Sequence, residues 1–160
     1  MTIFLIGFMG SGKSTVANLL ATDFIDMDAV IVDNIGMPIS AYFEKYGEPA
    51  FRQVESKLLK TLALSGKIVS TGGGIVSSKE NRRILSESTS QVIYLKSNFS
   101  DLYARIMTDK ANVRPLFLEH TKEALEVIYE SREALYEMVA TKTVLVTDKR
   151  PEDIVKEIEL

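Results

Sequence analysis

Five short apolar runs, rich in β-branched residues, recur along the chain and are separated by longer stretches of mixed polarity. We interpret these runs as strands, and they cover residues 2–6, 24–26, 67–70, 91–95 and 143–146. Strands that alternate with helices are typical of a parallel sheet with helices on both faces. The pattern therefore predicts an α/β fold.

The stretches between the runs have apolar residues at helical spacing. Two spans predict amphipathic helices, with Phe51, Val54, Leu58 and Leu62 on the apolar side of the first and Leu125, Ile128, Leu135 and Val139 on that of the second. Pro38 and Pro151 each suit the first turn of a further helix. The segment 108–121 interrupts the helical pattern, and we expect it to form a lid over the site.

Length and composition limit the architecture. The chain has 160 residues, of which 46% are hydrophobic, and this is enough for one globular domain with a sizeable core. We find no repeat, no low-complexity tract and no linker rich in Pro, Gly or Ser. One domain over residues 1–160 is therefore expected, and we expect it to act as a monomer.

Charge and rare residues exclude several classes of function. The 19 basic and 22 acidic residues give a net charge of -3, so no overall positive field attracts nucleic acid. Cysteine is absent and His120 is the single histidine, which argues against disulfides, thiolate chemistry and multi-histidine metal centres. No run of residues is long enough to span a membrane and no signal peptide is recognisable, so we expect a cytoplasmic protein.

The strongest motif is GFMGSGKST, which directly follows the first predicted strand. It matches G-x-x-x-x-G-K-[ST], with Gly7, Gly12, Lys13 and Ser14 in the fixed positions. Glycines let the backbone N–H groups surround an anion, the lysine reaches the terminal phosphates of a nucleotide, and the serine can ligate Mg²⁺. A strand before the motif and a helical pattern after it provide the required context, so the motif predicts nucleotide binding.

Two carboxylates, Asp26 and Asp28, stand at the end of the second predicted strand. Ligands of parallel sheets collect at the carboxyl ends of the strands, so both acids are expected in the same crevice as the phosphate-binding loop. One could hold Mg²⁺ and the other could orient or deprotonate an acceptor hydroxyl. A solvated turn with a helix cap is the alternative for these two residues.

Residues 31–36 (IVDNIG) also fit the D-x-x-G pattern of P-loop GTPases. That class needs a later N-K-x-D motif to read guanine, and the sequence has none. Moreover, Ile31 and Ile35 are one helical turn apart, which favours a helix here. The GTPase interpretation therefore fails.

Further candidates for ligand contact follow along the chain. Arg52 and Glu55 share a helix face, and a guanidinium held by a carboxylate suits recognition of an anionic substrate, although such a pair is often only a surface ion pair. Gly72, Gly73 and Gly74 follow the third strand, where glycines favour close approach of substrate or γ-phosphate. Arg114, in the expected lid, could stabilise the transferred phosphate.

Taken in order, these motifs resemble shikimate kinase. The resemblance rests on the phosphate-binding loop, Asp26-x-Asp28, Gly47-Glu48 with Phe51-Arg52-x-x-Glu55, Ser70-Thr71-Gly72-Gly73-Gly74, Arg114-Pro115-Leu116 and Arg132-x-x-Leu135-Tyr136. It implies a P-loop fold similar to nucleoside monophosphate kinases, with three α/β/α layers, a five-stranded parallel sheet of order 2-3-1-4-5, an acceptor segment near 27–57 and a lid. The implied reaction moves the γ-phosphate of ATP to the 3-hydroxyl of shikimate, a step of aromatic amino acid biosynthesis.

The resemblance also implies roles for individual residues. Lys13, Asp28 and Arg114 would be catalytic, and Ser14 and Asp26 would serve Mg²⁺. Shikimate would be bound by Asp28, Arg52, Gly72, Gly73, Gly74 and Arg132. ATP would be bound by Gly10, Ser11, Gly12, Lys13, Ser14, Thr15, Arg105, Arg114 and Arg150, with Arg105 against the adenine.

Two connections are shorter than the family usually shows. The chain passes from the first helix to the second strand through 21–24, so this helix is expected to end early, and the loop 148–151 on the adenine side is tight. A kinase for another small hydroxylated acid, and a catalytically silent nucleotide-sensing protein, are the alternatives. Lys13, Ser14, Asp26, Asp28 and Arg114 are all present, so nothing in the chain favours the silent protein.

Overall fold

A five-stranded sheet forms the centre of the computed structural model, which describes residues 1–108 and 120–158. The strands are β1 (Ile3–Ile6), β2 (Ile25–Asp26), β3 (Ile68–Ser70), β4 (Gln91–Lys96) and β5 (Lys142–Leu145). They are ordered β2-β3-β1-β4-β5, and each pairing of neighbours is parallel. The predicted fold class and strand order are confirmed.

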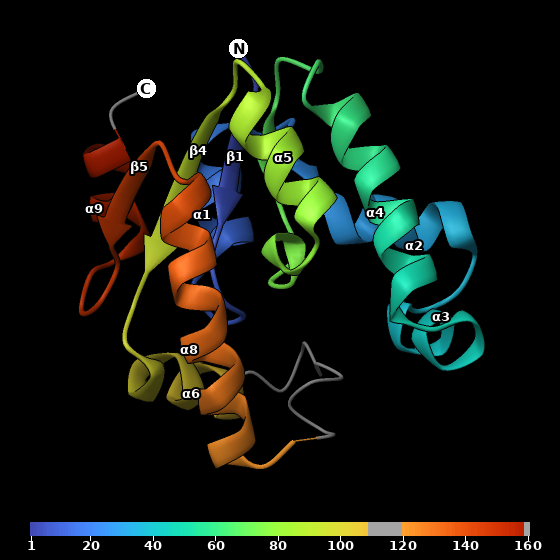
Figure 1. Ribbon diagram of the computed structural model, residues 1–160. Helices are drawn as coiled ribbons and strands as arrows, with labels where there is room; N and C mark the ends of the chain where they lie inside the picture. The colour runs from blue at the N-terminus through green and yellow to red at the C-terminus, as the bar shows by residue number, and fades with distance from the viewer. Residues whose placement is uncertain (109–119, 159–160) are drawn as a thin grey trace.

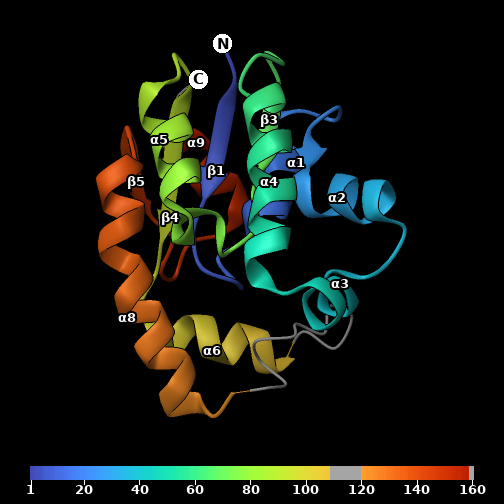
Figure 2. The same ribbon diagram turned by 45° about the vertical axis from the view of Figure 1, so that its right-hand side comes forward.

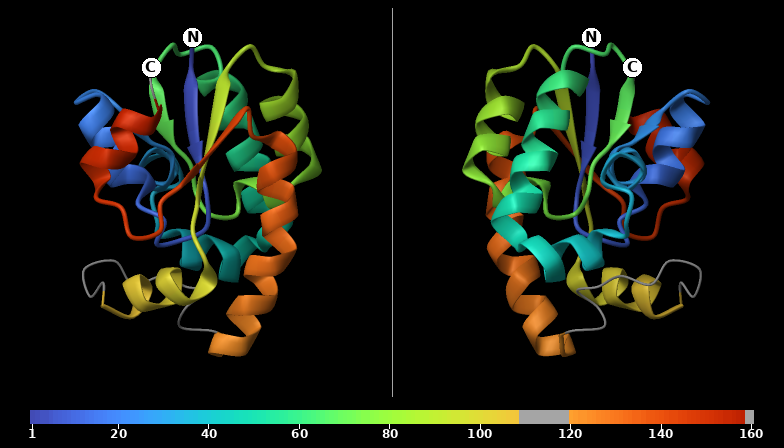
Figure 3. Two further views of the ribbon diagram at one scale, coloured as in Figure 1. Left: turned by 90° about the vertical axis from the view of Figure 1, so that its left-hand side faces the viewer. Right: turned by 90° about the vertical axis from the view of Figure 1, so that its right-hand side faces the viewer.

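Helices cover both faces of this sheet, as the two views in Figure 3 show. One face carries α1 (Lys13–Leu20) and α9 (Pro151–Ile158), and the other carries α4 (Glu48–Leu62), α5 (Lys79–Glu87) and α8 (Lys122–Val139). Alternate side chains of β1 point to opposite faces of the sheet. Leu5 packs with α1 and α9, whereas Phe4 and Ile6 pack on the opposite side. The sheet is therefore buried from both sides.

The remaining elements gather toward the carboxyl ends of the strands. They are α2 (Met27–Ile35), α3 (Ile39–Tyr46), the short 3₁₀ helix η1 (Ile75–Ser77) and α6 (Phe99–Thr108). In Figures 1 and 2 the strand arrows point down toward α3 and α6, which lie below the sheet. This edge is where ligands bind in parallel α/β sheets.

Local sequence signals explain where several helices begin and end. Asp26 caps α2 by accepting a hydrogen bond from the Ala29 backbone N–H at 3.3 Å. Gly36 ends α2 in the left-handed conformation, with φ of 70°, so the stretch that fits D-x-x-G is a helix end. Pro38 precedes α3 and Pro151 begins α9, as predicted. The first helix ends at Leu20, as the short connection predicts.

Among the described residues, no helix is both long and apolar enough to cross a membrane.

Candidate active site

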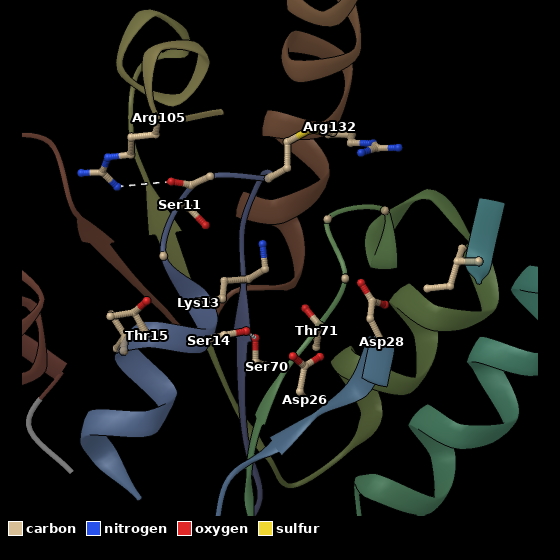
Figure 4. Close-up of a pocket in the computed structure, with 18 of the residues that line it drawn as sticks. Ser11, Lys13, Ser14, Thr15, Asp26, Asp28, Ser70, Thr71, Arg105 and Arg132 are labelled. Carbon is tan, nitrogen blue, oxygen red and sulfur yellow. Dashed lines mark hydrogen bonds between the residues drawn. The ribbon is translucent and has the colours of Figure 1, made fainter. Parts of the chain in front are cut away.

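A cavity of about 790 Å³ lies at the carboxyl ends of the strands and joins the loop after β1 to the ends of β2 and β3. Figure 4 shows the labelled residues of this cavity. Fourteen of the candidate residues line it: Gly10, Ser11, Gly12, Lys13, Ser14, Thr15, Asp26, Asp28, Arg52, Gly72, Gly73, Gly74, Arg105 and Arg132. Residues far apart in sequence thus come together as the motifs predict.

The loop after β1 has the backbone shape of an anion cradle. Gly10 and Gly12 have φ values of 84° and 89°, which residues with a side chain rarely adopt, and α1 begins directly after Gly12. The Lys13 ammonium donates hydrogen bonds to the carbonyl oxygens of Gly7 at 2.7 Å and Phe8 at 3.2 Å. The positive end of the α1 dipole and the charge of Lys13 therefore both lie at the loop after β1.

Oxygen ligands for a hard cation lie beside this loop. The hydroxyl groups of Ser14 and Ser70 are 3.0 Å apart, and Ser70 is the register partner of Asp26 in the neighbouring strand. Hydroxyl and carboxylate oxygens are the ligands that Mg²⁺ prefers, usually together with water and substrate phosphates. The donor set thus fits a magnesium ion bound with a nucleotide.

Asp28 faces the cavity from the first turn of α2, and Figure 4 shows it across from Lys13. Burial raises the pKa of this carboxyl group, and the charge of Asp26 raises it further, whereas Lys13 and Arg52 lower it. The net shift is upward, so burial outweighs the two cations. A carboxylate in this state is suited to accept a proton from a hydroxyl group.

Arg52, which also lines the cavity, is held by two carboxylates of its own helix. Its Nη1 atom lies 2.9 Å from Oε1 of the buried Glu55, and its Nη2 atom lies 3.2 Å from Oε1 of the exposed Glu48. Its guanidinium carbon is 5.2 Å from the ring centroid of Phe51. The predicted pair with Glu55 is confirmed, and the burial of Glu55 distinguishes it from an ordinary surface pair.

The glycines after β3 make room for the side chains of the site. An atom at the Cβ position of Gly72 would lie 2.8 Å from Oδ1 of Asp28, and one on Gly74 would lie 2.5 Å from Nη2 of Arg52. Both distances are shorter than real Cβ contacts. The glycine run was expected to admit a ligand, and here a Cβ on Gly72 or Gly74 would meet the side chains of Asp28 and Arg52.

Arg132 brings a second guanidinium into the cavity from α8. Only 9% of its surface is exposed, and its buried Nη1 atom has no hydrogen-bond partner among the described residues. Its guanidinium carbon lies 6.0 Å from the ring centroid of Phe8. A buried cation that lacks a hydrogen-bond acceptor on one nitrogen favours an anionic ligand in this space.

Three other arginines were predicted as site residues, and the structure describes two of them, Arg105 and Arg150. Arg105 donates a hydrogen bond to the Gly10 carbonyl oxygen at 3.3 Å, drawn as a dashed line in Figure 4. Arg150 is exposed, pairs with Asp153 at 3.4 Å and is not among the residues that line the cavity, whereas its neighbour Lys149 is. Arg114 and most of the expected lid at 108–121 lie outside the described residues.

Three polar residues of this region had no predicted role. Ser70 joins Ser14 to the end of β2, as described above. Tyr136 is fully buried and its hydroxyl group donates a hydrogen bond to the carbonyl oxygen of Gly73, which ties α8 to the glycine run. Asn81 hydrogen-bonds to Glu55 at 2.8 Å. For Asn81 the sequence does hold a signal, since it shares a helix face with the apolar Ile84 and Leu85.

The fold and the cavity together define a P-loop kinase for a small, negatively charged acceptor. The loop after β1 provides the donor side, and Asp28, Arg52 and Arg132 also line the cavity. Hydroxyl groups suit the carboxylate and an acid suits the two guanidinium groups.

Comparisons with known proteins define the family. The family model for shikimate kinase matches residues 9–159. The chain is 45% identical to a shikimate kinase of Streptococcus thermophilus, over 99% of each chain. Among solved structures, a shikimate kinase from Acinetobacter baumannii in complex with shikimate is similar, with a TM-score of 0.88, 33% identity and coverage of 98% of this chain and 89% of that one. A shikimate kinase from Aquifex aeolicus gives a TM-score of 0.78 and 34% identity, with coverage of 99% and 93%.

The chain therefore belongs to the shikimate kinase family. The resemblance that the motifs predicted is confirmed.

Proposed function

We propose that the protein transfers the γ-phosphoryl group of ATP to the 3-hydroxyl group of shikimate, giving shikimate 3-phosphate and ADP. The observation that carries this proposal is the buried Nη1 atom of Arg132, which has no hydrogen-bond partner within residues 1–108 and 120–158 and belongs to a residue that lines the same cavity as Lys13. A carboxylate ligand would supply the missing acceptor. Family membership supports shikimate as that ligand.

In this proposal the two ends of shikimate are held by different elements. Arg52 and Arg132 bind its carboxylate, Asp28 binds ring hydroxyls, and Gly73 lies against the ring. Because both guanidinium groups rest near aromatic rings and Arg52 is paired with Glu55, the carboxylate site is formed before the ligand arrives. Preformed sites lose less conformational entropy on binding.

The protein promotes phosphoryl transfer mainly by positioning the two substrates and by neutralising the charge of the transferred group. The 3-oxygen of shikimate forms a bond to the γ-phosphorus while the bond from that phosphorus to the β,γ-bridging oxygen breaks, and ADP leaves. The hydroxyl proton passes to the Asp28 carboxylate, whose raised pKa supports this role. Lys13 stabilises the negative charge on the transferred group. Arg114 is proposed for the same task, and Arg105 is proposed to lie against the adenine.

Ser14 directly, and Asp26 through water, are proposed to hold Mg²⁺ with the phosphates. The ion would neutralise negative charge on the β- and γ-phosphate oxygens.

We propose one kinase domain over residues 1–160, with an acceptor segment near 27–57. A monomeric state and a cytoplasmic location stay predictions of the sequence.

The decisive assay measures ADP release with shikimate, gluconate and nucleoside monophosphates offered in parallel. We expect turnover with shikimate and a ³¹P resonance for a phosphate monoester on its 3-oxygen. Turnover with another acceptor and none with shikimate would overturn the proposal.

Replacing Arg52 should chiefly weaken the binding of shikimate. We expect Arg52→Ala to raise the KM for shikimate roughly 10- to 100-fold, because a hydrogen bond to a charged group contributes about 1.5–3 kcal/mol. The KM for ATP should stay close to that of the wild type. Arg83→Ala, which removes an exposed arginine outside the cavity, is the control. A normal shikimate KM in Arg52→Ala would contradict the assigned role.

A methyl group on Gly74 should displace Arg52 without unfolding the protein. Gly74 has φ of -93° and ψ of 10°, which alanine tolerates, while the new Cβ would lie 2.5 Å from Nη2 of Arg52. We expect Gly74→Ala to raise the shikimate KM about tenfold and to leave the melting temperature within a few degrees of wild type. The same change in the Arg52→Ala background should add nothing; equal effects in both backgrounds would refute this mechanism.

A further inference from the structure

Asn81 is a buried polar residue outside the cavity. It lies in the first turn of α5, its side chain has no exposed surface, and it does not line the cavity. Buried amide groups are costly unless every hydrogen bond is made. Its contacts therefore indicate what it does.

Two side-chain hydrogen bonds fix the orientation of this amide. The Ser56 hydroxyl group donates to Oδ1 of Asn81 at 2.5 Å, and the Asn81 Nδ2 atom donates to Oε1 of Glu55 at 2.8 Å. Since Oδ1 can only accept a hydrogen bond, the donor end of the amide must face Glu55. The Asn81 backbone N–H is held by the Ser78 hydroxyl group at 3.3 Å. The amide is thus fixed on both sides.

The same carboxylate oxygen of Glu55 receives the Arg52 guanidinium. Oε1 accepts from Nη1 of Arg52 at 2.9 Å and from Nδ2 of Asn81 at 2.8 Å. Glu55 is 1% exposed, and its pKa is raised overall: burial raises it most, Arg52 and Asn81 lower it, and the charge of Asp28 raises it. Both donors thus favour the ionised form that Arg52 needs as its partner.

We propose that Asn81 is a positioning residue, which holds Glu55 in the conformation that aims Arg52 at the carboxylate of the acceptor. Arg52 is then held by Glu55 and lies close to Gly74. The direction of a substrate-binding guanidinium is set in part by α5, which does not line the cavity in the described chain. The identity of the acceptor in this inference rests on the proposed function. The effect of Asn81 on the order of the Arg52 side chain does not depend on it.

The test compares Asn81→Asp and Asn81→Leu with wild type. Asn81→Asp keeps the shape and the acceptor for Ser56 but replaces the donor to Glu55 with a second buried carboxyl group, whereas Asn81→Leu removes the donor without adding a charge. We expect both variants to raise the shikimate KM about tenfold, short of the roughly 10²-fold that a 1 Å misplacement can cost. The KM for ATP should stay within about twofold, since the nucleotide end of the cavity is untouched. In the Arg52→Ala background neither change should raise the shikimate KM further.

A second measurement needs no ligand. The order parameter of the Arg52 Nε–Hε group, measured by ¹⁵N relaxation and assigned with Arg52→Lys, should be clearly lower in the Asn81 variants than in wild type. Ile84→Ala is the control, because it removes a buried apolar side chain from the same helix and leaves the Asn81 amide in place. This control should lower the melting temperature while both the shikimate KM and the order of Arg52 stay at wild-type values.

The possible results test the positioning role of Asn81 and the proposed function separately. An unchanged shikimate KM, or an unchanged Arg52 order parameter, in Asn81→Leu would overturn the positioning role. An equal rise in KM in Ile84→Ala would also overturn it, by showing that loss of stability is sufficient. If the wild type does not phosphorylate shikimate, the proposed function fails, and the order of Arg52 still decides the role of Asn81.

Discussion

Lys13→Ala should lose most of its turnover. The ammonium of Lys13 lies at the mouth of the loop after β1, held by the carbonyl oxygens of Gly7 and Phe8. In phosphoryl transfer a cation at the transferred group acts mostly in the transition state, and comparable arginines contribute about 10³- to 10⁵-fold to kcat. We expect a fall in kcat of about 10³-fold, measured by ADP release at saturating ATP and shikimate.

The matched control for this variant is Lys67→Ala. Lys67 is exposed and pairs with Asp23 at 2.5 Å, outside the cavity. Its removal should leave kcat within about twofold of wild type, because exposed ion pairs contribute little. The KM for shikimate should be nearly normal in Lys13→Ala, since the acceptor is held by other side chains. An unchanged kcat in Lys13→Ala would show that Lys13 does not stabilise the transferred group.

Asp28→Asn should be nearly inactive and yet more stable than wild type at pH 7. The amide cannot accept the hydroxyl proton, and loss of a general base lowers kcat by about 10²- to 10⁴-fold. The gain in stability follows from the raised pKa of the Asp28 carboxyl group. Keeping this buried group ionised costs free energy in the folded state, and asparagine removes that cost.

The direction of the pH dependence follows from proton linkage. Because the folded pKa of Asp28 lies above the unfolded value, the folded state binds more protons, and stability falls as pH rises through this window. The difference in melting temperature between Asp28→Asn and wild type should therefore be positive at pH 7 and shrink toward pH values near the ordinary pKa of about 4. For a chain of this size each kcal/mol corresponds to about 2–4 °C.

Thermal unfolding without ligands, at pH 7 and at several lower pH values, measures this difference. Asp33→Asn, on the exposed side of the same helix, is the control and should change neither activity nor the pH dependence. A lower melting temperature of Asp28→Asn at pH 7 would mean that its contacts with Lys13 and Arg52 outweigh its burial.

The sequence predicted the parts of the fold that depend on local pattern. The alternation of strands and helices, the loop with Lys13 and the pair of Arg52 with Glu55 follow from spacing within a few residues. The strand order came from the resemblance to a family, since hydrophobic periodicity does not specify which strands are neighbours. From the sequence pattern alone, Arg132 could not be distinguished from a surface arginine. Its burial is evident only in the packed structure.

Contacts between distant elements could not be predicted. Asn81 and Glu55 are 26 positions apart, and no spacing rule connects α5 with α4. The glycine run after β3 is a second example. Three glycines indicate that other groups approach the backbone closely, but the identity of these groups depends on the packing of α2 and α4 against the loop. In the structure these groups are Asp28 and Arg52.

The central place of β1 in the sheet affects how the protein is made. This strand leads into the nucleotide loop, yet its two neighbours, β3 and β4, begin only at residues 68 and 91. The stretch from Ile3 to Lys96 must be synthesised before both edges of β1 can be paired, and this takes on the order of 5–20 s at ordinary elongation rates. Until then an apolar strand with an unpaired edge is exposed to other chains, as is typical of strands that await distant partners. The loop with Lys13 is thus synthesised well before the two strands that complete the pairing of β1.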